Sequence, residues 1–138
     1  MINKFMSYSN SYTIFRNDRN RYEGGVIIGT KRGIKSIEIQ TKTIETITIK
    51  MFNKSHKCII SSVYITSNIT SKEMTQFNDV MHKLCEYSKD YQILICGDFD
   101  INFLDNSKNS VEDFKNIINQ FGIQTKSQDI NLSLLFLH

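Results

Sequence analysis

The stretch from Tyr91 to Asp100 constrains the fold of this chain more than any other part. It reads Tyr-Gln-Ile-Leu-Ile-Cys-Gly-Asp-Phe-Asp, an apolar run followed by a glycine and two carboxylates. The run from Ile93 to Cys96 has no polar alternation, which is typical of a strand covered on both faces. Gly97 permits a sharp exit, so we expect Asp98 and Asp100 at the strand's mouth. Because sheet-based enzymes tend to place chemistry at such strand ends, the stretch predicts a candidate site.

A strand and a helix are predicted immediately before this stretch. Cys58–Ile65 is rich in β-branched residues and lacks clean alternation, which favours a central strand with Tyr64 at its carboxyl end. Thr70 and Glu73 form a capping-box pattern. Apolar residues then recur at helical spacing: Met74, Phe77, Val80, Met81, Leu84 and Tyr87. The segment therefore predicts a strand, helix, strand unit of the crossover type.

The remaining elements predict a mixed α/β (α+β) domain. Strands are expected near Ser11–Phe15, Val26–Ile28, Ile34–Ile39 and Ile44–Met51, and a second helix at Val111–Phe121 with Gly122 as its C-terminal cap. Residues 123–129 are polar, and residues 130–138 form an apolar tail with no evident closing element. At 138 residues the chain is long enough for one domain at most.

Charge is distributed unevenly along the chain. The first 60 residues carry 11 Lys and Arg against 4 Asp and Glu, whereas residues 61–138 carry 6 against 10. A basic half that attracts a polyanion and an acidic half that holds a cation would suit a nuclease. Solvated surface charge on separate elements is the simpler explanation of an excess of this size.

Several polar residues are candidate nucleic-acid contacts. Arg16 and Arg19 lie among aromatic residues and could bind phosphates beside stacked bases, although a loop covering its own aromatics is the plainer interpretation. Asn68 lies in the polar loop that follows Tyr64 and is a further candidate. Glu45 lies on the same strand face as Ile47, Ile49 and Met51, and an acid at the rim of an apolar face could be a ligand. Because the end of a strand is usually solvated, we expect Glu45 to be structural.

The cysteines and the hydropathy indicate the cellular setting. Three cysteines at wide spacing, without a Cys-x-x-Cys pair, favour a reducing compartment over a disulfide framework or a zinc site. The N-terminus is polar, and no apolar run approaches the roughly 18 residues of a membrane span. We expect an intracellular protein, nuclear or cytoplasmic, that is neither secreted nor membrane-bound.

The string Cys96-Gly-Asp-Phe-Asp100 resembles the Gly-Asp-Phe-Asn signature of the endonuclease/exonuclease/phosphatase superfamily. Phe15-Arg-Asn-Asp-Arg19, followed by Gly24-Gly-Val-Ile-Ile28, is similar to a stretch of the non-LTR retrotransposon endonucleases in that superfamily. Ile44–Ile49 and Ser62-Val-Tyr64 look like the strands that lead to the family's catalytic-site tyrosine. The resemblance covers roughly residues 8 to 123 in matching order.

The resemblance implies a DNase I-like fold, a four-layer α/β/β/α sandwich of two sheets, and a phosphodiesterase that nicks DNA with Mg²⁺ or Mn²⁺. Asp98 matches the aspartate that orients or deprotonates the attacking water, and Tyr64 matches the tyrosine that binds the scissile phosphate. Asp100 stands where the family has an asparagine; with Asp98 it is also a candidate metal ligand. DNA is the implied substrate, and a reverse transcriptase domain in a parent polyprotein is an implied partner.

Two departures shape the functional expectation. Asp100 is an acceptor where the family has a donor. The family's metal-binding Glu belongs upstream of Met1, and its Ser-Asp-His segment belongs beyond Gly122, so we expect residues 1–138 to form a single partial domain. Two functions remain: a nicking endonuclease that is weak or inactive in this form, or a non-catalytic remnant that at most binds metal or nucleic acid. An Asp-x-Asp metal site of a transferase is a third interpretation, with no other support in the sequence.

Overall fold

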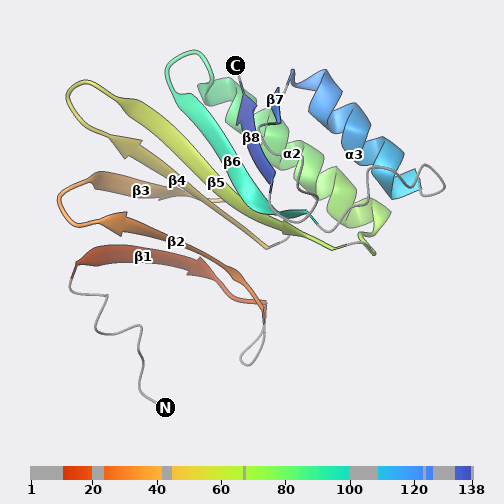
Figure 1. Ribbon diagram of the computed structural model, residues 1–138, viewed down its shortest axis with the longest axis horizontal. Helices are drawn as coiled ribbons and strands as arrows, with labels where there is room; N and C mark the ends of the chain where they lie inside the picture. Colours follow the sequence, from red (N-terminus) through yellow and green to blue (C-terminus); the bar gives the residue numbers. More distant parts are fainter. Residues whose placement is uncertain are drawn as a thin grey trace.

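The computed structural model describes residues 11–19, 24–41, 45–66, 68–99, 109–122, 124–125 and 133–137. Its elements, in chain order, are β1 (Tyr12–Asn17), β2 (Val26–Lys31), β3 (Lys35–Ile39), β4 (Thr46–Phe52), β5 (Lys57–Ile65), α2 (Ser71–Tyr87), β6 (Gln92–Phe99), α3 (Asn109–Gln120), β7 (Gln124–Thr125) and β8 (Ser133–Leu137) (Figure 1). The predicted strands and helices are therefore present, with bounds that differ by a few residues.

The strands form two sheets. β1 and β2 pair as an antiparallel two-stranded sheet, and the other six strands follow the order β3-β4-β5-β6-β8-β7. β5 and β6 are parallel neighbours, and the other neighbouring pairs are antiparallel. Parallel neighbours need a crossover connection, which α2 supplies here, as the sequence predicts. β5 is also central in its sheet, between β4 and β6.

The main core lies between the six-stranded sheet and the two helices. The predicted apolar face of α2 is buried through Met74, Phe77, Val80, Met81 and Leu84. The rings of Phe77 and Phe114 stack at 5.5 Å between centroids and join α2 to α3. From the sheet, inward-facing residues of β5 and β6 complete this core: Ile59, Val63, Ile65, Ile93 and Ile95.

The two-stranded sheet covers part of the opposite face. β2 contacts β4 and β5, and β1 contacts β4. Residues of a strand alternate between faces, so Ile47 and Ile49, which pair with Ser62 and Ile60, point away from the helices. They are nevertheless 2% and 0% exposed. Figure 1 shows the helices and the β1–β2 sheet on different sides of the larger sheet.

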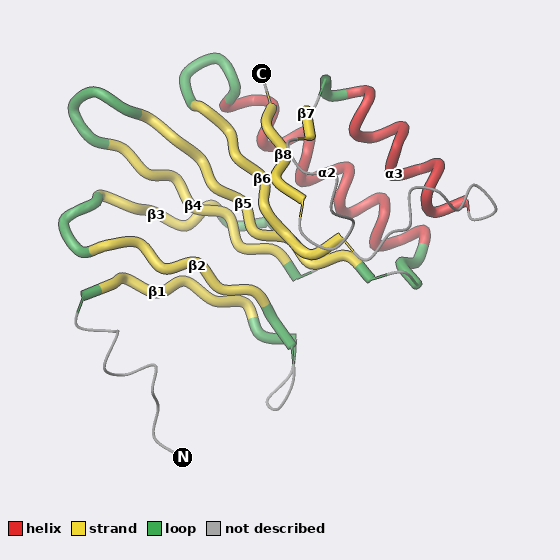
Figure 2. The backbone as a smooth tube through the Cα atoms, viewed as in Figure 1, coloured by secondary structure: helices red, strands yellow, loops and turns green. Residues whose placement is uncertain are grey.

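Two sequence expectations need correction. β6 is not covered evenly on both faces: Ile93 and Ile95 are buried under the helices, whereas Leu94 and Cys96 are only half-buried. The apolar tail also contributes a strand to the sheet, because residues 133–137 form β8, which lies between β6 and β7 (Figure 2). The tail's apolar run is thus explained by its position inside a sheet.

The predicted caps are present at the start of α2 and at the end of α3. The Thr70 hydroxyl accepts a hydrogen bond from the Glu73 amide at 3.2 Å, and the Glu73 carboxylate accepts one from the Thr70 amide at 3.0 Å. Gly122 follows α3 with a positive φ of 61°. Neither described helix combines the length and the apolar character that crossing a bilayer requires.

Candidate functional site

Tyr64 and Asp98 lie side by side at the carboxyl ends of β5 and β6. They are Cα partners in the parallel register of these strands. Partners in neighbouring strands point to the same face, and here it is the face opposite to the helices. Tyr64 is half-buried and Asp98 is exposed. The structure thus brings together, on one sheet edge, two of the three residues predicted to be catalytic.

Gly97 makes this close pairing possible. A Cβ atom at this position would lie 1.9 Å from the Val63 carbonyl oxygen. β6 continues through Gly97 to Phe99, so the expectation that the glycine ends the strand is wrong. Its role is to let two backbones approach, and this approach fixes Asp98 beside Tyr64.

Glu45 also belongs to this cluster, although the sequence suggested a structural residue. Its backbone carbonyl accepts a hydrogen bond from the Tyr64 amide at 3.0 Å, which extends the β4–β5 pairing by one residue. One carboxylate oxygen accepts a hydrogen bond from the Gly25 amide at 3.2 Å, and the other forms an ion pair with Nε of Arg19. The only sequence pattern that pointed to this placement is that Glu45 lies on the same strand face as the apolar residues Ile47 and Ile49.

Arg19 connects the β1–β2 sheet to Tyr64. Its guanidinium carbon lies 5.1 Å from the centroid of the Tyr64 ring, within the range of a cation–π contact. The hydrogen bond to Glu45 raises the pKa of Arg19, and a hydrogen bond to Tyr64 raises that pKa further. Asn17 supports this placement, because its side-chain amide donates to the Thr46 carbonyl at 3.2 Å.

A small cavity opens beside this cluster. Its volume is about 110 Å³, and its lining includes Glu45, Tyr64, Thr66, Ile69 and Glu73. One liquid water takes up about 30 Å³, so the cavity has room for a few waters or a small anion. Both of its carboxylates already accept hydrogen bonds, Glu45 from Gly25 and Glu73 from Thr70.

The other predicted site residues lie elsewhere. Arg16 forms a bidentate contact with Asp18 at 2.9 to 3.1 Å. Asn17 reaches β4, so its strand neighbour Arg16 points away from the larger sheet and from Tyr64. Asn68 is exposed in the connection between β5 and α2. Asp100 lies outside the described residues.

The described residues do not fit a metal centre. No group of three or more His, Cys, Asp or Glu side chains within them is placed to hold a metal ion. Mg²⁺ and Mn²⁺ prefer several oxygen ligands. Both carboxylate oxygens of Glu45 are already bound, one in the ion pair with Arg19 and the other by the Gly25 amide. Of the two aspartates predicted to bind metal, Asp98 is described and Asp100 lies outside the described residues.

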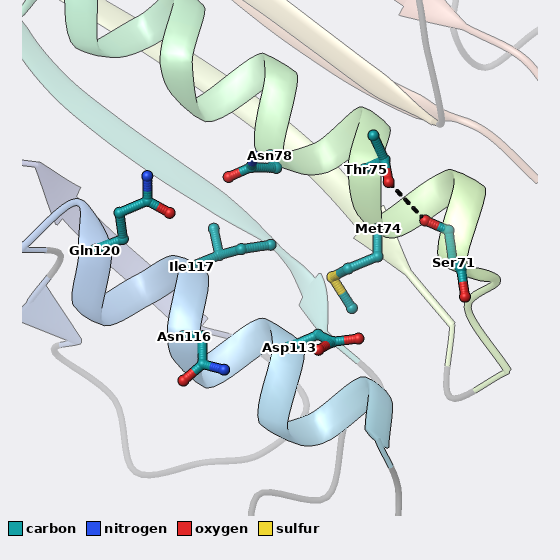
Figure 3. A pocket seen from close by; sticks show the side chains of 8 residues that line it. All are labelled: Ser71, Met74, Thr75, Asn78, Asp113, Asn116, Ile117 and Gln120. Carbon is teal, nitrogen blue, oxygen red and sulfur yellow. Dashed lines mark hydrogen bonds between the residues drawn. The ribbon is translucent and has the colours of Figure 1, made fainter.

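A larger groove lies in the helix layer, away from this cluster. It measures about 340 Å³ and is lined by both helices, with Ser71, Asn78 and Asp113 among its polar residues (Figure 3). The side-chain oxygen of Asn78 is buried and has no hydrogen-bond partner among the described residues. At Tyr64, carboxylates lie beside a phenol and a guanidinium, and the lining of the groove has no such combination. The groove is larger, but the Tyr64 cluster is the better candidate for a functional site.

Solved structures share this arrangement of strands and helices. The endonuclease domain of TRAS1, a telomere-specific non-LTR retrotransposon, superposes with a TM-score of 0.70 and 9% identity, covering 92% of this chain and 67% of that one. The human Nocturnin catalytic domain, solved with a bound sulfate anion, gives a TM-score of 0.60 and 9% identity, covering 97% and 63%. No protein-family model and no curated protein sequence matches the chain.

These likenesses establish the fold. The chain spans about two thirds of each of the two solved domains. Among the described residues, two sheets and two helices match part of this two-sheet fold, as the resemblance around Asp98 implies. The chain therefore has a DNase I-like α/β fold.

Proposed function

We propose that this chain is a nucleic-acid-binding domain of nuclease ancestry that holds a phosphodiester at the edge formed by Tyr64 and Asp98. The observation that carries the proposal is the register that sets these two residues side by side, with Arg19 over the Tyr64 ring. A phenol hydroxyl can donate to a phosphate oxygen, and a guanidinium supplies the positive charge that a phosphate requires. The sulfate in the Nocturnin structure is a tetrahedral anion of similar shape, which supports this choice of ligand.

The charges of the cluster argue against unaided catalysis. Glu45 offsets the charge of Arg19, and Asp98 adds an exposed negative charge. Phosphodiester hydrolysis develops further negative charge in its transition state, and the loss of one preorganised group that stabilises such charge commonly costs about 10²- to 10³-fold in rate. Arg19 is the cation that contacts Tyr64, and no group of metal ligands lies among the described residues.

A second candidate is a divalent-metal-dependent phosphodiesterase that nicks DNA. The observation that favours it is the exposure of Asp98 next to Tyr64, where a carboxylate could orient an attacking water. Metal ligands would then have to come from outside the described residues, Asp100 included. DNA as substrate, a reverse transcriptase domain as partner and an intracellular location remain proposals drawn from the sequence.

Fluorescence anisotropy with a labelled DNA duplex tests the binding function. In EDTA we expect measurable binding that weakens as salt rises, since phosphate contacts release counterions. Tyr64→Phe should weaken binding several-fold, and Asp98→Asn should tighten it because a repulsive charge is removed. Tyr12→Phe, an exposed tyrosine of β1, is the matched control and should change nothing. Equal affinity of wild type, Tyr64→Phe and Asp98→Asn would overturn the proposal.

Plasmid nicking separates the two candidates. Purified chain with Mg²⁺ or Mn²⁺ should leave supercoiled plasmid intact. Robust metal-dependent nicking that Asp98→Ala abolishes would instead establish the second candidate. In that case Asp100→Asn, which restores the family's donor, should raise the rate.

A further inference from the structure

Arg19 is fixed from three sides. Its Nε is ion-paired with Glu45, its guanidinium faces the Tyr64 ring, and its side chain packs against the backbone of Gly24. The side chain of Glu45 is 17% exposed and that of Arg19 is 45% exposed. A largely buried carboxylate thus holds a guanidinium that solvent and ligands can still reach.

The two consecutive glycines make this placement possible. A Cβ atom on Gly24 would lie 3.0 Å from Nε and 3.1 Å from the guanidinium carbon of Arg19. A Cβ atom on Gly25 would lie 2.7 Å from the Asn17 carbonyl oxygen. Both glycines have positive φ, 77° and 122°, and the Gly25 amide donates to Glu45. The glycine pair therefore positions both Arg19 and Glu45, because Gly24 leaves room for the guanidinium and Gly25 binds the carboxylate.

We propose that Arg19 is a positioning residue of the Tyr64 site and also the cation that a bound phosphodiester meets. Glu45 and the Gly24–Gly25 turn hold the guanidinium, and the guanidinium in turn fixes the plane of the Tyr64 ring. This inference rests on the proposed phosphodiester-binding function. It assigns a role to Glu45, which lies too far from Arg19 in the sequence for any local pattern to link them.

The alternative is that Arg19 acts only as an exposed charge, and Glu45→Gln distinguishes the two roles. The substitution removes a negative charge and keeps the side-chain shape. If charge alone mattered, the variant would bind DNA more tightly. If Glu45 holds Arg19 in place, the variant should bind more weakly, because the ion pair and the charge-assisted hydrogen bond are lost.

DNA affinity in EDTA provides the first measurement. We expect Arg19→Ala to weaken binding about tenfold, as the loss of a charge-assisted contact commonly does. Arg19→Lys should restore only part of the affinity, since an ammonium group lacks the planar fork. Arg16→Ala is the matched control, an exposed arginine of the preceding strand that is bound to Asp18 and points away from Tyr64. It should have a much smaller effect.

A tyrosine signal provides the second measurement and does not depend on DNA. The chain has 6 tyrosines, so 3-fluorotyrosine labelling gives few ¹⁹F resonances, and Tyr64→Phe identifies the one of interest. Arg19→Ala, Glu45→Gln and Gly24→Ala should all shift the Tyr64 resonance, with folding checked by circular dichroism. Gly33→Ala controls for backbone strain, because Gly33 also has a positive φ but a Cβ atom there would meet nothing within 4 Å.

The outcomes separate this inference from the proposed function. Weaker binding by Glu45→Gln together with a shifted Tyr64 resonance supports it. Tighter binding by Glu45→Gln with an unmoved resonance overturns it and leaves the binding function standing. If the wild type, Tyr64→Phe and Asp98→Asn bind DNA equally, the binding function fails, and with it the role of Arg19 as a phosphate contact. The ¹⁹F signal then still decides whether Arg19 positions Tyr64.

Discussion

Gly97 and Val63 approach so closely that a single added methyl group would lie 1.9 Å from the Val63 carbonyl oxygen. Gly97→Ala should therefore separate β5 from β6 and destabilise the fold by about 1 to 3 kcal/mol or more. Urea unfolding followed by circular dichroism measures this cost. Gly29→Ala is the control, since the nearest atom to its Cβ would be the end of the flexible Ile14 side chain at 3.2 Å. Equal midpoints for the two variants would contradict the prediction.

Thr48 and Ser61 form a hydroxyl pair at 2.8 Å in the core, and both residues are fully buried. Thr48→Val should leave the Ser61 hydroxyl without its partner and cost about 1 to 3 kcal/mol. The double variant Thr48→Val/Ser61→Ala should cost less than the sum of the single changes in urea unfolding. Thr46→Val is an informative control. The Thr46 hydroxyl is buried without a hydrogen-bond partner among the described residues, so its removal should be neutral or stabilising.

Thr70 caps α2 through its hydroxyl, and Thr70→Ala should reduce the free energy of unfolding by about 1 kcal/mol. Thr75→Ala makes the same chemical change at an exposed position inside the helix, where its hydroxyl only donates to the Ser71 carbonyl. It should have little effect, because alanine is the better helix former. The prediction fails if both variants unfold at the same denaturant concentration.

Burial raises the pKa of the Cys96 thiol, and it also raises the pKa of Cys58, whereas Cys85 is exposed. Alkylation requires the thiolate, so iodoacetamide at pH 8 should modify Cys85 first in the folded protein. Peptide mass spectrometry over time gives the order, and modification in urea, where burial is lost, should erase it. The stabilisation linked to the raised pKa values is complete below the ordinary thiol value of about 8.5 and declines as pH rises through the folded values.

The parts of the fold that depend on local signals could be predicted from the sequence. The capping box at Thr70 and the apolar spacing from Met74 to Leu84 fix α2, and the runs on either side fix β5 and β6. A helix between two strands favours parallel neighbours, so their carboxyl ends meet. The sequence therefore predicts Tyr64 and Asp98 at the carboxyl ends of their strands, which parallel pairing brings together.

The remainder depends on contacts between distant segments. Arg19 and Glu45 lie 26 residues apart, and neither has a local pattern that identifies the other as its partner. Gly97 was predicted to end its strand. The sequence does not show that the Val63 backbone lies where a side chain at position 97 would be. β8 was missed for the same reason, since its place beside β6 is set by pairing across the sheet rather than by its own apolar run.

The docking of the β1–β2 sheet has a consequence for how the site could open. The Asn17 contact with Thr46 and the bonds of Arg19 and Gly25 to Glu45 join this small sheet to β4. A segment held by few contacts can detach at a lower free energy than global unfolding requires. Such a detachment would withdraw Arg19 while Tyr64 and Asp98 stay paired within β5 and β6. Ligand affinity would then scale with the fraction of molecules in which the β1–β2 sheet is docked. Hydrogen exchange in β1 and β2 would measure that fraction.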